Sequence, residues 1–448
     1  MHLFKQVQRL RAWVRIPKSN TTPIDQHFVR RALNPSEEIK RDRALVSLRC
    51  DTLVIGAGPA GSSCAHWLAR HGHDVVLVDQ HRFPRHKVCG DGLIPDTLEV
   101  LKRLGLFEEI MAQAQCVDHV RCIAPSQQHV DIQAPMAVIS RWLFDALLVK
   151  AAVKHGAGFH EGMRFEALHR DPMQADAVTG AWFRASGDPV LIKARQVVLA
   201  TGASSSALEA AGVEHRRAPS AMAMRTVISH PGLGHVVEGL QVIWHRSLSP
   251  GYAWLFPMPN QAYNLGVGVF DVAQHWPQEK INLRKLFQRL IHVNQLVARL
   301  VDEGTTLLPL KGAPLRSGLT GTSPSQDGLL ICGEAIGSTY GLTGEGIGKA
   351  METGLMAAES ILRSESQHGL VNSSIGAIYE TALESLHARY AQYEKANRIN
   401  RQAWLAEVLI RLASRSKRLR FQASEVLMER RSPADLVTMR GVLSVLLK

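Results

Sequence analysis

The segment Asp51-Thr52-Leu53-Val54-Ile55-Gly56-Ala57-Gly58-Pro59-Ala60-Gly61 decides the fold of this chain. The short apolar run Leu53–Ile55 precedes a GxGxxG loop, and an apolar helical pattern over 59–71 follows it. In such a loop Gly56 permits the tight turn, Gly58 leaves room for a pyrophosphate beside the backbone, and Gly61 lets the helix pack close to the strand. The start of the helix then offers unpaired N–H groups to the phosphates. The segment therefore predicts a dinucleotide site.

A second apolar run, Val75–Val78, ends at Asp79, which is 21 residues after Gly58. An acid at this distance accepts hydrogen bonds from the adenosine ribose hydroxyls and repels a 2′-phosphate. The site therefore favours FAD or NAD over NADP. Because the chain has only one such loop, we expect a flavoprotein that receives electrons from NADPH without a second dinucleotide domain, or from a reduced carrier protein.

The rest of the chain predicts an α/β fold that is α+β overall. Apolar runs at 197–200 and 329–332, with a helical pattern at 141–155, indicate a parallel sheet with crossover helices. Aromatic-rich alternation from about 218 to 275 indicates an antiparallel sheet. We expect a basic N-terminal extension at 1–50, a Rossmann-like FAD-binding domain at 51–217 and 311–375, an antiparallel-sheet substrate lobe at 218–310, and a basic helical region at 376–448.

The positive charge of the chain belongs to its two ends. The net charge is +12, of which residues 1–50 carry +7 and residues 395–448 carry +8, while the part between them carries −3. Basic ends fit an anionic membrane surface, and no nucleic-acid-binding motif is present, so we expect no nucleic-acid partner. Residues 2–16 form a basic amphipathic pattern that fits membrane contact, a helix packed on the protein, a disordered leader or a transit peptide.

Six scattered cysteines form no CxxC pair and no zinc-type spacing, which predicts no metal site and a reducing compartment. No apolar run reaches the roughly 18–20 residues that span a bilayer. The N-terminus lacks the apolar core of a secretory signal. We therefore expect a cytoplasmic protein with peripheral membrane association.

Five further motifs point to one family. They are RFPRHKVCGDG at 82–92, SRWLFD at 140–145, ICGEAIG at 331–337, GLTGEGI at 341–347, and YAWLFP at 252–257 followed after eight residues by Gly266-Val267-Gly268. With these motifs the chain resembles the geranylgeranyl reductase family, within the flavoproteins that share the p-hydroxybenzoate hydroxylase fold. The resemblance runs from about residue 51 to residue 440.

The resemblance implies a set of FAD-binding residues: Gly56, Gly58, Pro59, Ala60, Gly61, Asp79, Cys89, Gly90, Arg141, Gly202, Glu334, Gly344, Gly346 and Ile347. Most relatives have Asp where this chain has Glu334, which changes the reach of the carboxylate toward the ribityl chain. The helix that starts near Ile347 is expected to stabilise negative charge on the reduced flavin. Arg141 resembles the family arginine near the flavin linker, and a surface salt bridge is the alternative.

The resemblance also implies a prenyl-binding wall. Alternate residues of a strand face one side, so Tyr252, Trp254 and Phe256 are expected to form one aromatic surface, with Pro257, Gly266 and Gly268 beside it. An aromatic core strand is the alternative. The implied reaction is saturation of carbon–carbon double bonds of a prenyl chain by hydride transfer from reduced flavin.

The residues expected to act in this reaction are Cys89, Tyr252 and Trp254. The aromatic rings can stabilise positive charge on the substrate by cation–π attraction. Lys87 is expected to lower the pKa of the Cys89 thiol. A small buried hydrophobic role for Cys89 stays open.

The C-terminal region offers an apolar face with basic residues around it. Its members are Trp404, Leu405, Val408, Leu409 and Leu412, with Arg411, Arg415, Lys417 and Arg418 among or beyond them. This face fits contact with a membrane that feeds lipid into the cavity, or a helical cap over the cofactor domain.

Other functions fit the same sequence. A flavin monooxygenase or halogenase shares the fold, although the halogenase WxWxIP motif differs at its first and fifth positions. A flavoprotein electron-transfer dehydrogenase usually has a four-cysteine cluster motif, which is absent. A flavin-binding membrane partner without turnover is the non-enzymatic alternative. The prenyl substrate stays open among geranylgeranyl diphosphate, a chlorophyll precursor, an archaeal-type lipid and a prenylated quinone.

Overall fold

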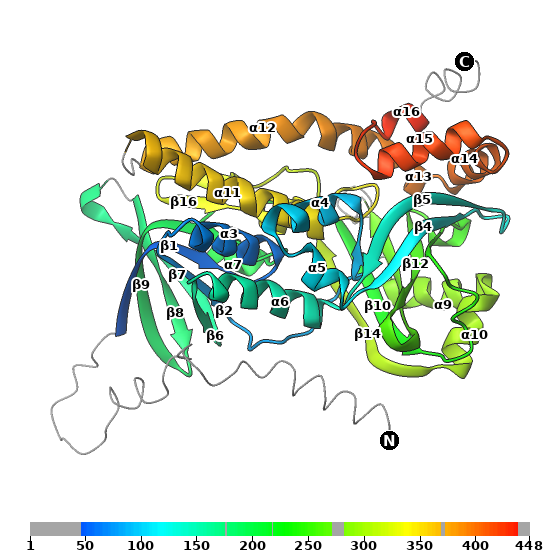
Figure 1. Ribbon diagram of the computed structural model, residues 1–448, viewed down its shortest axis with the longest axis horizontal. Helices are drawn as coiled ribbons and strands as arrows, with labels where there is room; N and C mark the ends of the chain where they lie inside the picture. The colour runs from blue at the N-terminus through cyan, green and yellow to red at the C-terminus, as the bar shows by residue number, and fades with distance from the viewer. Residues whose placement is uncertain (1–45, 175–176, 217, 271–281, 369–371, 438–448) are drawn as a thin grey trace. The chain divides into compact units, whose positions relative to one another are not determined.

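The computed structural model describes residues 46–174, 177–216, 218–270, 282–368 and 372–437. These residues form one compact unit built on two eight-stranded sheets. The sheets lie side by side, with the helices α11 (Ile347–His368) and α12 (Asn372–Ala396) along the first (Figure 1). The pattern at 2–16 and the last eleven residues lie outside the described residues.

The first sheet has the order β15-β16-β9-β1-β2-β6, with β8 and β7 added at β9. The pairs of β1 with β2 and β9, of β9 with β16, and of β2 with β6 are parallel. Its strands are β1 (Val46–Ile55), β2 (Val75–Asp79), β6 (Gly158–Glu161), β7 (Met163–Asp171), β8 (Ala177–Ala185), β9 (Asp188–Leu199), β15 (Ser325–Gln326) and β16 (Leu329–Ile331).

Helices cover this sheet as the sequence predicts. The helix α3 (Pro59–Arg70) packs against α6 (Arg141–Lys154) and α11, and α12 packs against α11. The apolar runs of β1, β2, β9 and β16 are buried in the core between them. The α/β fold with a Rossmann-like cofactor domain is confirmed.

The second sheet has the order β14-β10-β13-β12-β11-β4-β5-β3. All its pairs are antiparallel except β11 with β4. Its strands are β3 (Gly92–Leu93), β4 (Gln115–Ile123), β5 (His129–Val138), β10 (Ala221–Ser229), β11 (Leu240–Ile243), β12 (Gly251–Met258), β13 (Ala262–Phe270) and β14 (Thr305–Leu315).

This sheet extends beyond the lobe expected at 218–310. The hairpin of β4 and β5, with β3, comes from the range assigned to the cofactor domain, and β14 runs past residue 310. The reason is the pairing of β4 with β11, a contact between strands more than a hundred residues apart that local patterns cannot show. The domain boundaries as such stay a prediction.

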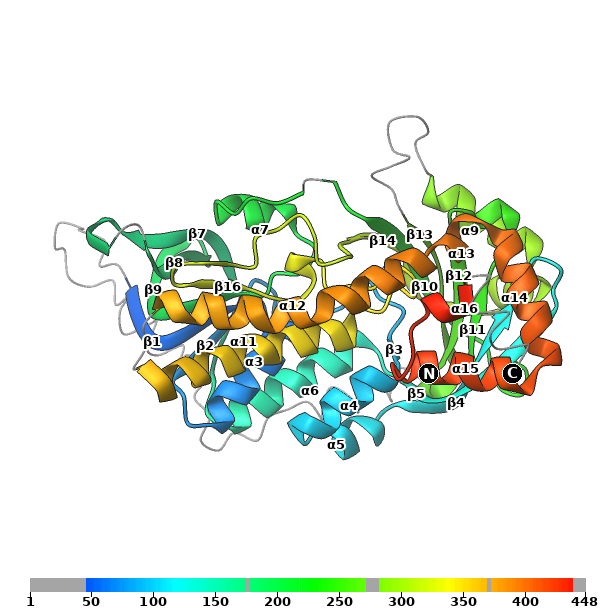
Figure 2. The same ribbon diagram turned by 90° about the horizontal axis from the view of Figure 1, so that it is seen from above.

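Short helices complete the second lobe. α9 (Leu283–Val293) and α10 (Gln295–Glu303) pack on β10, α4 (Pro95–Leu104) packs against β5 and α11, and α5 (Phe107–Met111) packs against α4. The long helix α12 leads from the first sheet to the C-terminal helices (Figure 2). Those helices are α13 (Arg398–Arg401), α14 (Ala403–Arg415), α15 (Lys417–Leu427) and α16 (Ala434–Val437).

Candidate active site

A single large cavity connects the two lobes. Its volume is about 1130 Å³, above the roughly 300–1,000 Å³ usual for a small-molecule site. Its wall includes the glycine loop after β1, the aromatic residues of β12, the loop before α11, and residues of α14 and α15. The cavity therefore has room for a large cofactor together with an apolar ligand.

The three glycines of the loop have the backbone conformation and the close contacts that the GxGxxG pattern predicts. Gly56 has φ +104°, and a Cβ there would lie 2.4 Å from the carbonyl oxygen of Ala200. A Cβ on Gly61 would lie 1.9 Å from the oxygen of Gly56, so only glycine allows the helix this close. A Cβ on Gly58 would meet only an Arg85 nitrogen at 3.8 Å, which leaves space beside the backbone.

Polar groups around this space fit FAD. The N-terminus of α3 has no side-chain cap, so its N–H groups are available to a pyrophosphate. Asp79 lines the cavity, and its two oxygens accept hydrogen bonds from the N–H groups of Ala57 (2.9 Å) and His81 (2.8 Å). Oδ1 also lies 3.2 Å from Nδ1 of His81, so Oδ2 is the oxygen that keeps a lone pair for a ribose hydroxyl. Arg85 adds a cation near Gly58.

Every expected cofactor residue except Gly61 lines the cavity. Gly202 and Gly344 have φ +72° and +66°, a backbone conformation that favours glycine. Glu334 accepts a hydrogen bond from the N–H of Arg316 at 3.4 Å. Burial raises the pKa of Glu334, and nearby Lys87 lowers it in part. The contacts of these residues with FAD stay a prediction.

Arg141 is not part of a surface salt bridge. It is 8% exposed, and its guanidinium makes two hydrogen bonds to Asp145 at 2.6 and 2.9 Å. Arg85 pairs with the same carboxylate at 3.0 Å. The ion pairs hold both arginines at the cavity, where they line its wall.

The aromatic wall expected from strand alternation is present. The ring centroids of Tyr252 and Trp254 are 6.5 Å apart, as are those of Trp254 and Phe256. Phe270 of β13 stacks on Tyr252 at 5.4 Å, and Trp244 lies 5.9 Å from Tyr252. All five rings line the cavity, so the strand is not simply an aromatic core strand.

The glycines of the GxG motif make room for this wall. Gly266 lies directly opposite Trp254, and Gly268 lies opposite Tyr252. A Cβ on Gly266 would lie 2.2 Å from Cζ2 of Trp254, so the indole ring occupies the place of a side chain. Gly268 lines the cavity, whereas Gly266 and Pro257 do not. Direct substrate contact by these two residues stays a prediction.

Asn264 joins the wall to the KVCGDG segment. Its Oδ1 accepts a hydrogen bond from the indole N–H of Trp254 at 2.9 Å. Its Nδ2 donates to the carbonyl of Cys89 at 2.8 Å and to Oδ2 of Asp91 at 2.9 Å. This fully buried amide fixes the ring plane and the backbone near Cys89 together. Asn264 is not among the residues predicted from the sequence, although a lone amide in the apolar strand AYNLGVGVF is a detectable signal.

Comparison with known proteins decides the family. The model of the FAD binding domain family matches residues 49–351. Menaquinone reductase of Mycolicibacterium smegmatis is 31% identical over 70% of this chain and 76% of its own. Digeranylgeranylglycerophospholipid reductase of Methanocaldococcus jannaschii is 26% identical over 69% of this chain and 76% of its own. A geranylgeranyl bacteriochlorophyll reductase-like structure from Thermoplasma acidophilum superposes with a TM-score of 0.70 and 19% identity, covering 90% and 96% of the two chains.

The chain belongs to the geranylgeranyl reductase family. It is an FAD-dependent oxidoreductase.

Cys89 lies at the cavity of this family member, but the expected effect of Lys87 is wrong. Burial raises the pKa of the Cys89 thiol, and Arg141, rather than Lys87, is the cation that lowers it in part. The thiol therefore keeps its proton at neutral pH. Burial also raises the pKa of neighbouring Asp91 to about 6.

Tyr252 closes one end of the wall. Its hydroxyl donates a hydrogen bond to the carbonyl of Thr343, in the loop before α11. Burial raises the pKa of the hydroxyl, and Glu345 raises it further. Tyr252 is therefore neutral, and it attaches the aromatic wall to the loop of Gly344 and Gly346.

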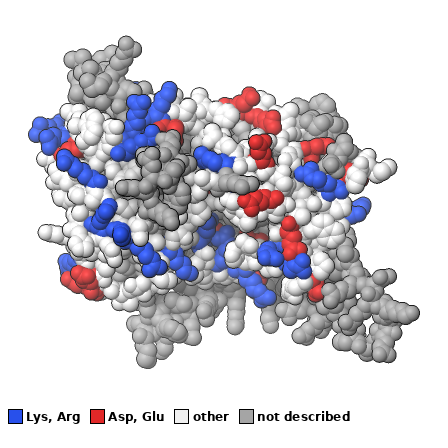
Figure 3. Space-filling view, turned by 180° about the vertical axis from the view of Figure 1, so that it is seen from behind, with Lys and Arg blue, Asp and Glu red and all other residues white. Residues whose placement is uncertain are grey.

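The C-terminal helices face the cavity on one side and solvent on the other. Leu409, Ile410, Ala413, Leu419 and Ala423 line the cavity. Trp404, Val408 and Phe421 are 55%, 45% and 59% exposed. In the rear view, Lys and Arg side chains gather on the side that carries these helices (Figure 3). The region thus caps the cavity and also presents an apolar, basic outer face.

No helix of the described residues is long and apolar enough to cross a membrane. Those residues likewise include no group of three or more His, Cys, Asp and Glu placed to hold a metal ion.

Proposed function

We propose that the protein is a reductase that saturates carbon–carbon double bonds of a prenyl chain. The observation that carries this proposal is the single cavity, which joins the dinucleotide loop to the aromatic wall of β12 and to apolar side chains of α14 and α15. An apolar extension of this kind suits an apolar ligand better than a small polar substrate.

Bound FAD would supply the hydride for this reaction. The chain's own residues supply the surroundings: the wall of Tyr252, Trp254 and Phe256 excludes water and orients an apolar chain. Each ring face can stabilise positive charge on the substrate by roughly 0.5–2 kcal/mol. Asn264 holds the Trp254 ring in the orientation that this needs.

A prenylated quinone is the substrate class to test first, followed by an isoprenoid glycerolipid. Two relatives are named for a menaquinone and for a digeranylgeranylglycerophospholipid, and both kinds of lipid carry isoprenoid chains. The first of these relatives is the more similar in sequence. A nicotinamide or a reduced carrier protein would reduce the flavin.

Peripheral contact with an anionic membrane would bring such a lipid to the cavity. Trp404 and Phe421 can insert into the interface, and Arg411, Arg415, Lys417 and Arg418 can pair with lipid headgroups. The opposite sides of the same helices line the cavity, so an entering chain has a short apolar path.

The test supplies FAD-loaded protein with reductant and each lipid, and measures lipid mass and oxygen consumption together. The proposal expects products heavier by two hydrogens per step and no oxygen use that depends on the lipid. Lipid-dependent oxygen consumption with an oxygenated or halogenated product would overturn it. Trp254→Leu should lower turnover more than binding, with Trp254→Phe, which keeps a ring, as the matched control.

A further inference from the structure

A buried carboxyl group reaches the cavity from the loop before α11. Glu345 is 7% exposed and lines the cavity. Its Oε1 accepts a hydrogen bond from the N–H of Gly348 at 2.7 Å, in the first turn of the helix. Thr343, two residues earlier, accepts the hydroxyl of Tyr252, so the loop that carries Glu345 touches the aromatic wall. The site described above gives this side chain no role.

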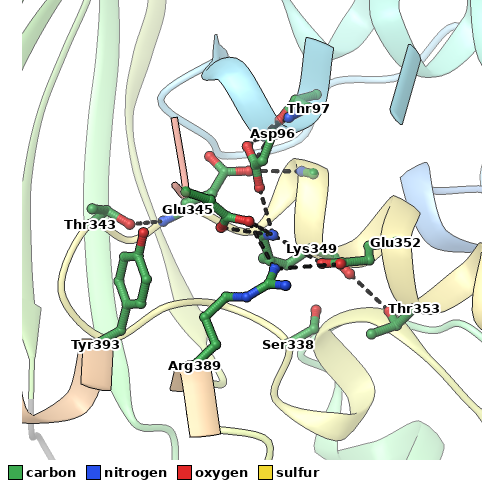
Figure 4. Close-up of polar contacts among 12 residues, drawn as sticks. Asp96, Thr97, Ser338, Thr343, Glu345, Lys349, Glu352, Thr353, Arg389 and Tyr393 are labelled. Carbon is green, nitrogen blue, oxygen red and sulfur yellow. Dashed lines mark hydrogen bonds and ion pairs between the residues drawn. The ribbon is translucent and has the colours of Figure 1, made fainter. Parts of the chain in front are cut away.

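A hydroxyl group connects Glu345 to a second buried carboxyl. Thr97 Oγ1 lies 3.3 Å from Oε1 of Glu345 and 3.3 Å from Oδ1 of Asp96. Thr97 is completely buried, and the side chain of Asp96 is 6% exposed. Since a hydroxyl can both donate and accept, the three side chains form a line along which a proton can pass (Figure 4).

The line continues to solvent through an ion-pair network. Lys349 Nζ lies 3.0 Å from Asp96, 2.9 Å from Glu352 and 2.9 Å from Glu429. Arg389 pairs with the same two glutamates. The side chains of Glu352 and Arg389 are 22% and 37% exposed. The network therefore has one end in solvent and the other at the cavity.

The charges of this network do not balance when every group is ionised. Its carboxyl groups are Asp96, Glu345, Glu352 and Glu429, and its cations are Lys349 and Arg389. An uncompensated buried charge costs several kcal/mol, which a bound proton removes. Asp96, Glu352 and Glu429 form ion pairs with Lys349 or Arg389, and Glu345 is in none of these pairs, so a proton is best placed on Glu345.

The surroundings support this placement. Burial and the nearby carboxyl of Asp96 raise the pKa of Glu345, and burial likewise raises that of Asp96. The other titratable groups that face the network include the hydroxyls of four tyrosines: Tyr252, Tyr340, Tyr390 and Tyr393. Burial raises the pKa of each, so they stay protonated and add no charge.

We propose that Glu345 is the acid that supplies the proton consumed by the reduction in the cavity, and that Thr97 and Asp96 pass a replacement proton from the solvent end. The inference rests on the proposed function. Bound reduced FAD would supply the hydride for one carbon of the double bond. The O–H bond of Glu345 breaks, and its proton adds to the other carbon. The carboxylate of Glu345 regains a proton through Thr97. The two electrons come from the nicotinamide or carrier protein that reduces the flavin.

Glu345→Gln is the central variant. A glutamine keeps the size and the acceptor for the Gly348 N–H but has no acidic proton. It should therefore fold and bind FAD like the wild type and lose turnover by about 100-fold or more, the usual range of general-acid catalysis. Thr97→Val, which removes the hydroxyl at constant shape, should slow turnover and show a larger solvent isotope effect. Thr97→Ser, which restores the hydroxyl, should recover most of the rate.

A readout independent of turnover uses infrared difference spectra of the FAD-loaded protein, oxidised minus reduced, without lipid. The wild type should show a band from a protonated carboxyl group. Glu345→Gln should lack this band, and Glu352→Gln, which changes the solvent end of the network, should keep it. If the band is unchanged in Glu345→Gln, or if this variant turns over like the wild type, Glu345 is not the proton donor. The proposed prenyl reduction is not affected by that result. If the wild type leaves every prenyl lipid unchanged, the proposed function is wrong, and so is the role of Glu345 as the acid in prenyl reduction.

Discussion

A methyl group at position 266 has no space, so Gly266→Ala should disturb both the fold and the cavity. A Cβ there would lie 2.2 Å from Cζ2 of Trp254 and 2.6 Å from the backbone oxygen of Met224. Because carbon atoms in contact are about 3.5–4.0 Å apart, the indole has to move by roughly 1.3–1.8 Å. The hydrogen bond from the ring to Asn264 opposes this movement.

The expected cost combines two effects. Overpacking a dense region costs about 1–3 kcal/mol, and loss of the indole hydrogen bond adds about 0.5–1.5 kcal/mol. We therefore expect Gly266→Ala to lower the free energy of unfolding by about 1.5–4.5 kcal/mol, measured by urea denaturation of the apoprotein followed by tryptophan fluorescence. Affinity for a prenyl lipid should fall as well, since the ring moves within the cavity wall.

Gly268→Ala is the matched control from the same motif. A Cβ at this position meets only ring atoms of Phe270 and Trp254, at 3.7 Å and beyond, which is ordinary contact. Its free energy of unfolding should change by less than about 1 kcal/mol, although its methyl group points into the cavity and should weaken lipid binding. Equal stability of the two variants would refute the account of the GxG motif.

Further predictions concern the cofactor, the acid near Cys89 and the outer face. Asp79→Ala should weaken FAD binding by roughly 10- to 100-fold, because it removes a charged hydrogen-bond acceptor worth about 1.5–3 kcal/mol. The affinity is measured from the rise in flavin fluorescence when FAD is released. The pKa of Asp91 is raised from 3.8 to about 6, so the folded apoprotein binds this proton more tightly than the unfolded chain does. Asp96 and Glu345, whose pKa values are also raised, destabilise both proteins as pH rises. The wild type should therefore lose more stability than Asp91→Asn through this window, by at most about 3 kcal/mol; parallel urea midpoints for the two would contradict this. Trp404→Ser with Phe421→Ser should reduce flotation with anionic vesicles, and an unchanged floating fraction would exclude these helices as the membrane contact.

The parts of the fold that depend on local patterns could be predicted from the sequence. The strand, glycine loop and helix at 46–70 and the alternation of Tyr252, Trp254 and Phe256 depend on neighbouring residues, and the structure has them as expected. The alternation predicts that the three rings share one side of β12; that this side faces a cavity was implied by the family resemblance.

The parts that depend on distant pairs could not be predicted. The sequence shows Lys87 two residues from Cys89, but the cation that affects the thiol comes from α6, as Arg141. Likewise, Glu345 and Asp96 are 249 residues apart in the chain, and only the packing of α4 against α11 brings them to one hydroxyl. A Glu between two glycines, followed by a Lys four residues later, was the available signal.

The central claim is that electrons pass from reduced flavin in this cavity to a prenyl double bond. The most direct measurement mixes anaerobic, pre-reduced, FAD-loaded protein with a prenylated quinone in reduced form or with a geranylgeranyl lipid, and follows flavin absorbance and lipid mass in one sample. The account predicts that the flavin is reoxidised in step with a lipid heavier by two hydrogens. A flavin that stays reduced with every prenyl lipid until oxygen is admitted would contradict it.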